Sequence, residues 1–321
     1  MTEWLGENQV VAVIIFIIAG IGMSCNWFVV AFISQVPTLQ NAFGRLTTSQ
    51  ALSEAVHLTI FTFFVAPMVF FQVDAMEDIS KYFGHVLLIC YDICIYCHVL
   101  ISLNRMTAVM LPLQYERIFS MRNTKKMIIV VWALAILPSI YFYIIEDCDF
   151  YYTGDYWHFV FSSTPVCAVI AWYTDFLKYV SIVIMIAFID MFTLVRVHAL
   201  NVSVFRNGTS STVRRCRKAD ELNFLEQTCL QGAFFVCELL TYFVLYQYFE
   251  SRYIKFFFTT FAWICVHSAD GFITLIFNKD FHQIWKKSVR NIKIDAKTFT
   301  TSHSKTPNGL GNSRDDTSNR F

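Results

Sequence analysis

The sequence predicts an all-α membrane protein, a bundle of seven transmembrane helices, and two observations carry that prediction. Of the 321 residues, 56% are hydrophobic and only 15% are charged, which leaves too little polar surface for a soluble protein of this size. Apolar runs long enough to cross a bilayer, which takes about 20 residues per helix, recur along the chain. These runs lie near residues 9–33, 46–72, 84–111, 126–145, 173–197, 224–248 and 254–277.

The first run, "VVAVIIFIIAGIGMSCNWFVVAFI", is predicted to stay in the protein as a helix. It is longer than the core of a signal peptide, and the preceding "MTEWLGEN" is acidic where a signal peptide is basic. The chain then divides into a membrane domain, residues 1–290, and a tail, residues 291–321. The tail is polar and rich in Ser and Thr, so we expect it to be disordered and cytoplasmic.

Basic residues predict the orientation of the bundle, because Lys and Arg concentrate in cytosolic loops. One set of alternate loops contains Arg45, Arg117, Arg122, Lys125, Lys126, Arg206, Arg214, Arg215, Arg217, Lys218, Lys279, Lys286, Lys287 and Arg290. The other set contains Lys81, Arg252 and Lys255 and is rich in acids. We therefore expect an extracellular N-terminus.

The long loop after the fourth run alternates aromatic and polar residues around "TGD", which predicts a short hairpin over the bundle. Cys148 and Cys167 lie in this loop, on the predicted oxidising side of the membrane. A Cys148–Cys167 disulfide would close the loop. Cys90 in the third helix is a competing partner, and free thiols are a third alternative.

Arg105 interrupts the apolar stretch "HVLISLNRMTAVMLPLQYERIF" near the cytosolic end of the third helix. One interpretation is an anchor whose long side chain reaches the interface. The other is a switch, in which Arg105 pairs with Glu226 or Glu221 at the start of the sixth helix and releases it when the bundle opens. Asn104 directly precedes the arginine, and Tyr115 lies in the segment "LQYERIF" after the helix. Both belong, with Arg105 and Glu226, to the predicted coupling and switch residues.

Ionisable residues inside membrane helices are functional candidates. They are Glu54, His57, Asp92, His98, Asp190, Glu238, His267 and Asp270. Asn26, Glu54 and Asp270 are predicted to form one polar core network, which we interpret as a cluster that ties helices together in preference to a site for an ion. We expect no cofactor and no structural metal.

Aromatic residues dominate the outer half of the predicted bundle, in "DFYYTGDYWHFVF", "AWYTDF" and "YFVLYQYFE". They favour a cavity for a small, largely apolar ligand, although an interfacial belt of aromatic side chains is the alternative for any one of them. The candidate ligand contacts are Asp92, Tyr96, His267 and Trp157. Asp92 and Tyr96 share a helix face at a spacing of i, i+4, and an internal hydrogen bond is the competing role for Asp92.

Three segments carry a family resemblance: "NAFGRLTTSQALSEAVHLTIFTFFVAPMVFF", "LLICYDICIYCHVLISLNRMTAVMLPLQYERIFS" and "HSADGFITLIFNKDF". They resemble the nematode chemosensory G-protein-coupled receptors of serpentine receptor class X. The resemblance implies a receptor for a small apolar, volatile or pheromone-like molecule that activates a heterotrimeric G protein. It also implies a plasma-membrane or ciliary location, and arrestin binding through a phosphorylated tail.

The resemblance also implies roles for particular residues. Arg105 would contact the G protein, while Asn104 stands where rhodopsin-like receptors usually have an acid. Asn26 resembles the asparagine of the first helix, and Asp270 with Gly271 stands in place of the Asn-Pro of the seventh. "NKDFHQIWKKSVR" suits a short amphipathic eighth helix. The fifth, sixth and seventh helices contain no proline, so proline does not encode their kinks.

Other functional classes fit less well. An intramembrane aspartyl protease needs Gly-x-Gly-Asp and Pro-Ala-Leu segments, which the chain lacks, so we expect no enzyme activity. No long basic domain suggests a nucleic-acid partner. A ligand-gated channel or transporter remains the alternative, although the loop charges predict the opposite orientation to insect odorant receptor channels, and no internal repeat is evident.

Overall fold

A computed structural model describes residues 6–206, 212–278 and 281. This part of the chain contains seven helical segments long and apolar enough to cross a membrane, which confirms the predicted bundle. They span Glu7–Gln35, Ala42–Phe71, Ser80–Met110, Met121–Ile145, Pro165–Ala199, Cys229–Tyr248 and Arg252–Phe277. Of the segment predicted to form the eighth helix, only Asn278 and Phe281 are described, and Phe281 packs near Phe28 with 6.2 Å between ring centroids. The predicted tail lies outside the described residues.

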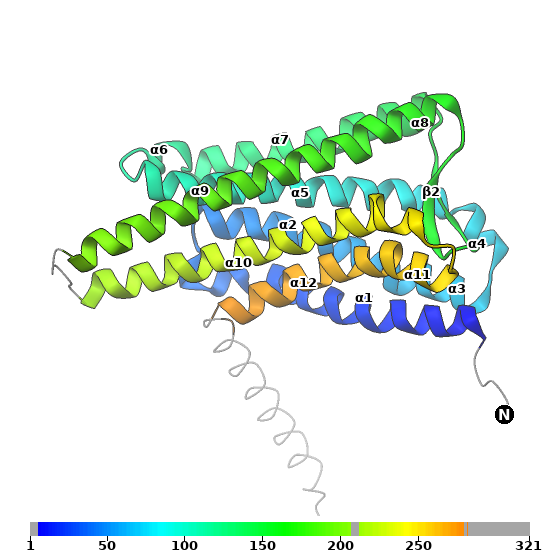
Figure 1. Cartoon of the computed structure of the whole chain (residues 1–321), viewed down its shortest axis with the longest axis horizontal. Helices are drawn as coiled ribbons and strands as arrows, with labels where there is room; N and C mark the ends of the chain where they lie inside the picture. The colour runs from blue at the N-terminus through cyan, green and yellow to red at the C-terminus, as the bar shows by residue number, and fades with distance from the viewer. Residues whose placement is uncertain (1–5, 207–211, 279–280, 282–321) are drawn as a thin grey trace, which may run out of the picture.

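The elements follow one another as α1 (Glu7–Phe32), α2 (Ala42–Ile60), α3 (Ala66–Phe71), α4 (Asp74–Asp78), α5 (Ser80–Met110), α6 (Tyr115–Ile118), α7 (Met121–Ile140), β1 (Phe150–Thr153), β2 (His158–Phe161), α8 (Pro165–Ala171), α9 (Lys178–Arg206), α10 (Thr212–Phe243), α11 (Arg252–Phe256) and α12 (Ala262–Phe277). The long helices lie side by side, with the β-strands at one end and α6 at the other (Figure 1). We call these the hairpin end and the Arg105 end.

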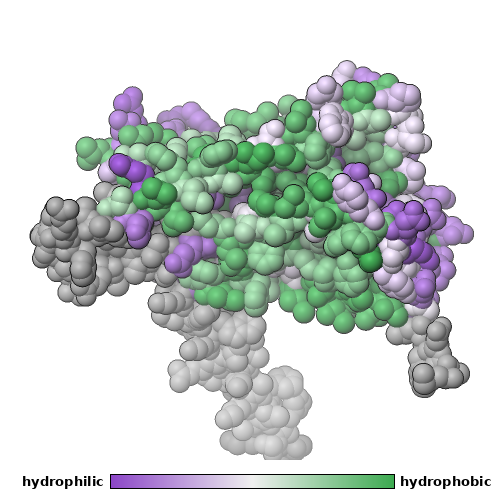
Figure 2. Space-filling model, in the orientation of Figure 1, coloured by the Kyte–Doolittle hydropathy of each residue, from purple (hydrophilic) through white to green (hydrophobic). Residues whose placement is uncertain are grey.

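The surface of the bundle is apolar around its middle and hydrophilic at both ends (Figure 2). Large apolar side chains such as Phe16, Leu137 and Phe188 are exposed along the helices. A soluble protein does not expose so continuous an apolar surface, whereas a bilayer covers it. The chain is therefore a multi-pass membrane protein.

Turns of π-helix provide irregularities near the hairpin end, and two of them lie beside a proline of the same span, Pro67 or Pro138. They span Phe61–Val65, Tyr141–Ile145, Trp172–Leu177 and Phe257–Phe261. The second of them ends the span that begins with α7, and each of the other three joins two successive α-helices into a single span. A π-turn contains an extra residue and changes which side chains face the bundle beyond it. Fixed local irregularities can thus do in this bundle what proline kinks do elsewhere.

The predicted hairpin is confirmed: β1 and β2 pair antiparallel, with Phe150 opposite Phe161 and Thr153 opposite His158. It packs closely on α5, because a Cβ atom on Gly84 would lie 1.9 Å from the Phe150 carbonyl oxygen. A residue with a side chain at position 84 would push the hairpin away. Cys148 and Cys167 beside the hairpin are joined by a disulfide, and Cys90 is a free thiol.

The turn of the hairpin is held by α1 and α11. Arg252 donates hydrogen bonds to the carbonyl oxygens of Gly154 at 3.0 Å and Asp155 at 2.6 Å. Trp157, which has a positive φ of 54°, donates from Nε1 to Asn8 Oδ1 at 2.7 Å. The hairpin is thus a fixed cover over this end of the bundle.

Acidification should loosen this cover. Burial, assisted by the charge of Lys255, lowers the pKa of His158 from 6.5 to about 4. When the hairpin opens, the imidazole takes up a proton below a pH of about 6.5, which the closed form does not do until about pH 4. This proton uptake therefore does not change the free energy of unfolding above pH 6.5. It lowers that free energy as the pH drops towards 4, by at most about 3 kcal/mol.

The measurement is the melting temperature of the wild-type chain and of His158→Phe at pH 7.5 and pH 5.0. We expect the wild type to lose more stability between the two values than His158→Phe. An exposed histidine, His198, provides the control variant His198→Asn, which should behave as the wild type. Equal losses in wild type and His158→Phe would contradict the assignment.

Candidate functional site

Buried polar side chains join three helices inside the bundle. Glu54 comes from α2, Cys94 and His98 from α5, and Asp270 from α12, and their potential ligand atoms all lie within 4.8 Å of one another. Gln50, one turn before Glu54 on α2, lies among them. We call these five residues the polar cluster. The prediction that Glu54 and Asp270 lie in one network agrees with these positions.

The Gln50 amide is the central donor of the polar cluster. Its Nε2 atom lies 3.0 Å from Glu54 Oε1 and 2.8 Å from Asp270 Oδ2. It also lies 2.9 Å from His98 Nε2, but an amide has only two hydrogens. We assign both to the carboxyl oxygens, because His98 Nε2 lies 3.0 Å from Asp270 Oδ2 and donates there. Cys94 Sγ lies 3.0 Å from Glu54 Oε1 and donates to the second acid.

Two carboxyl groups, a thiol and an imidazole are together a donor set that can hold a metal ion. In the structure the Gln50 amide donates into the same space, so the carboxyl groups are satisfied largely within the protein. Among the described residues, Asp270 Oδ1 has no hydrogen-bond partner. The arrangement fits the structural cluster that we favoured over an ion site.

Asn26, the third member of the predicted network, bonds to the backbone instead of to the acids. Its Nδ2 atom donates to the carbonyl oxygens of Gly22 at 3.1 Å and His267 at 3.0 Å, which ties α1 to α12. Gly271 permits this approach, because a Cβ atom there would lie 2.7 Å from the Asn26 side chain. Asn26 thus supports the position of Asp270 without touching it.

A column of rings in edge-to-face and tilted contact leads from the polar cluster towards the hairpin end. The His98 ring lies 4.8 Å from Phe235, and the His267 ring lies 6.2 Å from Phe235 and 5.5 Å from Tyr91, all between centroids. Tyr91 in turn lies 6.1 Å from Trp263. These rings form a continuous chain of contacts between Trp263 and the polar cluster.

The column ends in a small cavity of about 30 Å³ beneath the hairpin. Its walls are Leu88, Tyr91, Phe150, Asp175, Tyr179, Glu238, Leu239, Tyr242, Phe243 and Trp263. We call it the acidic cavity, because two carboxyl groups lie among the aromatic rings. Glu238 was recognised from the sequence as an intramembrane acid. Asp175 was missed, since an acid near a helix end is usually expected to face water.

The predicted ligand contacts lie around this cavity and not in its wall. Asp92 forms an ion pair with Lys178 at 2.5 Å and accepts a hydrogen bond from Tyr179 OH at 2.8 Å. The Lys178 ammonium also lies 6.0 Å from the Tyr96 ring. Asp92 therefore makes the internal bond that was its alternative role, and its predicted ligand contact stays a prediction.

Two further predicted contacts have structural partners. Trp157 is fully buried in the hairpin turn, where the Arg252 guanidinium lies 4.2 Å from its ring. His267 is buried in the ring column, 4.1 Å from His57. Contacts of either residue with a ligand stay predictions.

At the opposite end, the residues around Arg105 are held by neighbours on α2 and α6. The Arg105 guanidinium lies 3.7 Å from the centroid of the Phe43 ring, a cation–π contact that lowers the cost of a charge in hydrocarbon. Asn104 is buried and donates to Tyr115 OH at 3.1 Å, so two predicted partners lie together. Glu226 on α10 is exposed, and its pairing with Arg105 stays a prediction. The Glu221 side chain lies outside the described residues.

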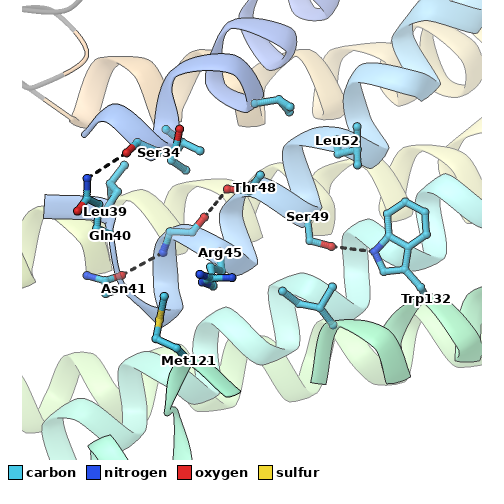
Figure 3. Close-up of a pocket in the computed structure, with 14 residues that line it drawn as sticks. Ser34, Leu39, Gln40, Asn41, Arg45, Thr48, Ser49, Leu52, Met121 and Trp132 are labelled. Atoms are coloured by element: carbon cyan, nitrogen blue, oxygen red, sulfur yellow. Dashed lines mark hydrogen bonds between the residues drawn. The ribbon is translucent and has the colours of Figure 1, made fainter. Parts of the chain in front are cut away.

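A hollow of about 740 Å³ lies between α1, α2 and α7 near the Arg105 end (Figure 3). Arg45 projects into it, and Trp132 Nε1 donates to Ser49 Oγ at 2.9 Å on its far side. It is separate from the polar cluster and from the ring column. Because it opens on the apolar flank of the bundle, we assign it no role in ligand recognition.

The close contact of α1 and α12 can be tested by a substitution that adds one methyl group at position 271. Gly271→Ala should destabilise the fold by about 1–3 kcal/mol, because its Cβ would overlap the Asn26 side chain at 2.7 Å. Gly20→Ala is a matched control, since its nearest neighbour, Thr62 Cγ2, lies 3.9 Å away. It should be neutral or slightly stabilising. Equal melting temperatures for the two variants would contradict the packing described.

Comparison with known proteins places the chain among receptors. The sequence profile described as "Serpentine type 7TM GPCR chemoreceptor Srx" matches residues 16–278. The chain is 33% identical over 303 residues to "Serpentine receptor class X 45" of Caenorhabditis elegans, which covers 88% of this chain and 82% of that protein. It is 25% identical over 252 residues to "Serpentine receptor class X-43" of the same organism, covering 78% and 77%.

The crystal structure of squid rhodopsin has the same fold. The two superpose with a TM-score of 0.67 at 16% sequence identity, over 95% of this chain and 93% of that one. At this identity the likeness concerns the fold alone. The profile match and the 33% identical relative together confirm the resemblance in sequence, and the chain belongs to the serpentine receptor class X family of seven-transmembrane G-protein-coupled chemoreceptors.

Proposed function

We propose that the chain is a chemosensory receptor that binds a small molecule beneath the hairpin and activates a heterotrimeric G protein at the Arg105 end. The supporting observation is the ring column from Tyr91 to His98, which joins the acidic cavity to the polar cluster. A ligand that changes the packing of the cavity walls biases the polar cluster between two arrangements. Membership of the receptor family supports the same assignment of ligand binding to the hairpin end and G-protein activation to the Arg105 end.

The Arg105 end is proposed to face the cytosol, with the N-terminus outside, on the strength of the loop charges. In this orientation Arg105, Asn104 and Tyr115 form the coupling surface, and an Arg105–Glu226 pair holds the closed state. We propose the plasma membrane, including a sensory cilium, as the location. Ser and Thr of the tail, Thr300, Thr301 and Ser302 among them, are proposed phosphorylation sites for arrestin binding, outside the described residues.

The ligand class follows from the walls of the cavity. Most of the residues around it are aromatic, which supports the predicted small, largely apolar compound. The two carboxyl groups in the same walls add a polar requirement that this prediction did not contain.

Coupling through Arg105 is tested by nucleotide exchange on a panel of heterotrimeric G proteins. Membranes carrying wild type or Arg105→Ala are compared with and without a Caenorhabditis elegans metabolite extract. We expect wild type to accelerate exchange and Arg105→Ala to lose at least about tenfold, because removing one charged contact costs about 1.5–3 kcal/mol. Staining an N-terminal tag on intact cells measures how much of each variant reaches the surface, so that exchange rates are compared at equal surface expression. The same staining reports whether the N-terminus is outside.

The control is Arg122→Ala, which removes an exposed arginine from the same end. It should retain exchange activity. If Arg105→Ala stimulates exchange as well as wild type does, Arg105 is an anchor on Phe43 and the coupling role is wrong. If wild type and variants conduct ions without any G protein, the channel alternative replaces the receptor proposal.

A further inference from the structure

The acidic cavity and its surroundings contain more carboxyl groups than basic groups to pair with them. Asp175 and Glu238 both lie in its walls, and Asp92 lies nearby. The one amine among them, Lys178, is held by Asp92 at 2.5 Å, and Tyr179 OH reinforces that pair. Three carboxyl groups thus share a single ammonium group within the described part of this region.

The hydrogen bonds of the two wall acids are few. Glu238 Oε2 accepts one bond, from Tyr91 OH at 2.9 Å, and has no basic partner among the described residues. Asp175 makes neither a hydrogen bond nor an ion pair with any described residue. Glu238 is buried and Asp175 is half-buried, so a carboxylate with so few donors is costly at either position, and a bound cation would remove the cost.

The rest of the wall suits a cation in particular. Six of the ten lining residues are aromatic: Tyr91, Phe150, Tyr179, Tyr242, Phe243 and Trp263. The faces of such rings attract ammonium groups. A cavity of about 30 Å³ admits an ammonium group but not the body of a ligand.

A groove beside the acidic cavity has room for the body of a ligand. An apolar groove of about 560 Å³ runs between α9 and α10, and Leu239 and Phe243 line both this groove and the acidic cavity. Its other walls are Phe176, Val180, Val183, Ile184, Ala187, Phe188, Met191, Val236, Leu240 and Val244. A hydrocarbon chain attached to the ammonium group would pass between the two shared residues into this groove.

We propose that the ligand is a hydrophobic amine. Its ammonium group lies between Asp175 and Glu238, and its hydrocarbon part lies in the groove between α9 and α10. Alkyl amines are protonated at neutral pH, like lysine, so they carry the required charge. The inference rests on the proposed function in taking the cavity as the ligand site, and it adds a cationic head to the small, largely apolar ligand proposed above.

The test uses the full chain in lipid nanodiscs and needs no G protein. Thermal unfolding is followed while ethylamine, butylamine and hexylamine are titrated, each beside the alcohol of equal length. We expect the amines to raise the melting temperature saturably, with half-saturation at lower concentration as the chain lengthens. The uncharged alcohols should need at least about tenfold higher concentrations, since a charged hydrogen bond is worth about 1.5–3 kcal/mol.

Variants identify the site. Asp175→Asn and Glu238→Gln should each weaken the effect of hexylamine about tenfold or more, whereas Glu77→Gln, an exposed acid at the same end, should leave it unchanged. The comparison of amines with alcohols on the wild-type chain decides between the two ligand classes even if a variant does not fold.

The proposal is overturned if the alcohols stabilise the chain as well as the amines, if no amine stabilises it, or if both carboxamide variants respond like wild type. The first outcome identifies a purely apolar site, and the last identifies amines acting through the bilayer. Each of these leaves the receptor proposal to the nucleotide-exchange assay, so the two failures are distinguishable.

Discussion

A single side-chain amide, that of Gln50, holds together the acids on which the arrangement of three helices depends. It donates to Glu54 on its own helix and to Asp270 on α12, while His98 on α5 bonds to the same aspartate. In a bilayer the hydrophobic effect does not press helices together, so packing and buried hydrogen bonds determine how they associate. Buried carboxyl groups without these donors would push α2 and α12 apart.

The same constraint gives the ring column its function. Because His98 is bonded to Asp270 and packs on Phe235, a displacement of the rings beneath the hairpin cannot be absorbed without disturbing the polar cluster. In the proposed mechanism the hairpin closes one end, and a ligand beneath it displaces the rings towards the polar cluster. At the other end the Arg105 guanidinium packs against the ring of Phe43 in a cation–π contact.

Hydrophobic run lengths predicted the seven helices, and the turn residues of "TGD" predicted the hairpin, because both features depend on local sequence. The acids inside the membrane were also visible as exceptions to the apolar pattern, and Glu54 and Asp270 do meet. Their donor Gln50 was not foreseen, nor was the pairing of Asp92 with Lys178, because partners depend on how each helix is rotated. The π-turns that alter this rotation have no sequence signal comparable to proline.

The most direct test of the account is a double-mutant cycle between α2 and α12. The free energy of unfolding is measured for Gln50→Met, Asp270→Leu and the double variant, with Gln50→Met and Asn26→Leu as a pair that makes no direct contact. The account predicts a coupling of about 1–3 kcal/mol for Gln50 with Asp270 and additivity for the control pair. Additive effects for Gln50 and Asp270, within about 0.5 kcal/mol, would contradict it.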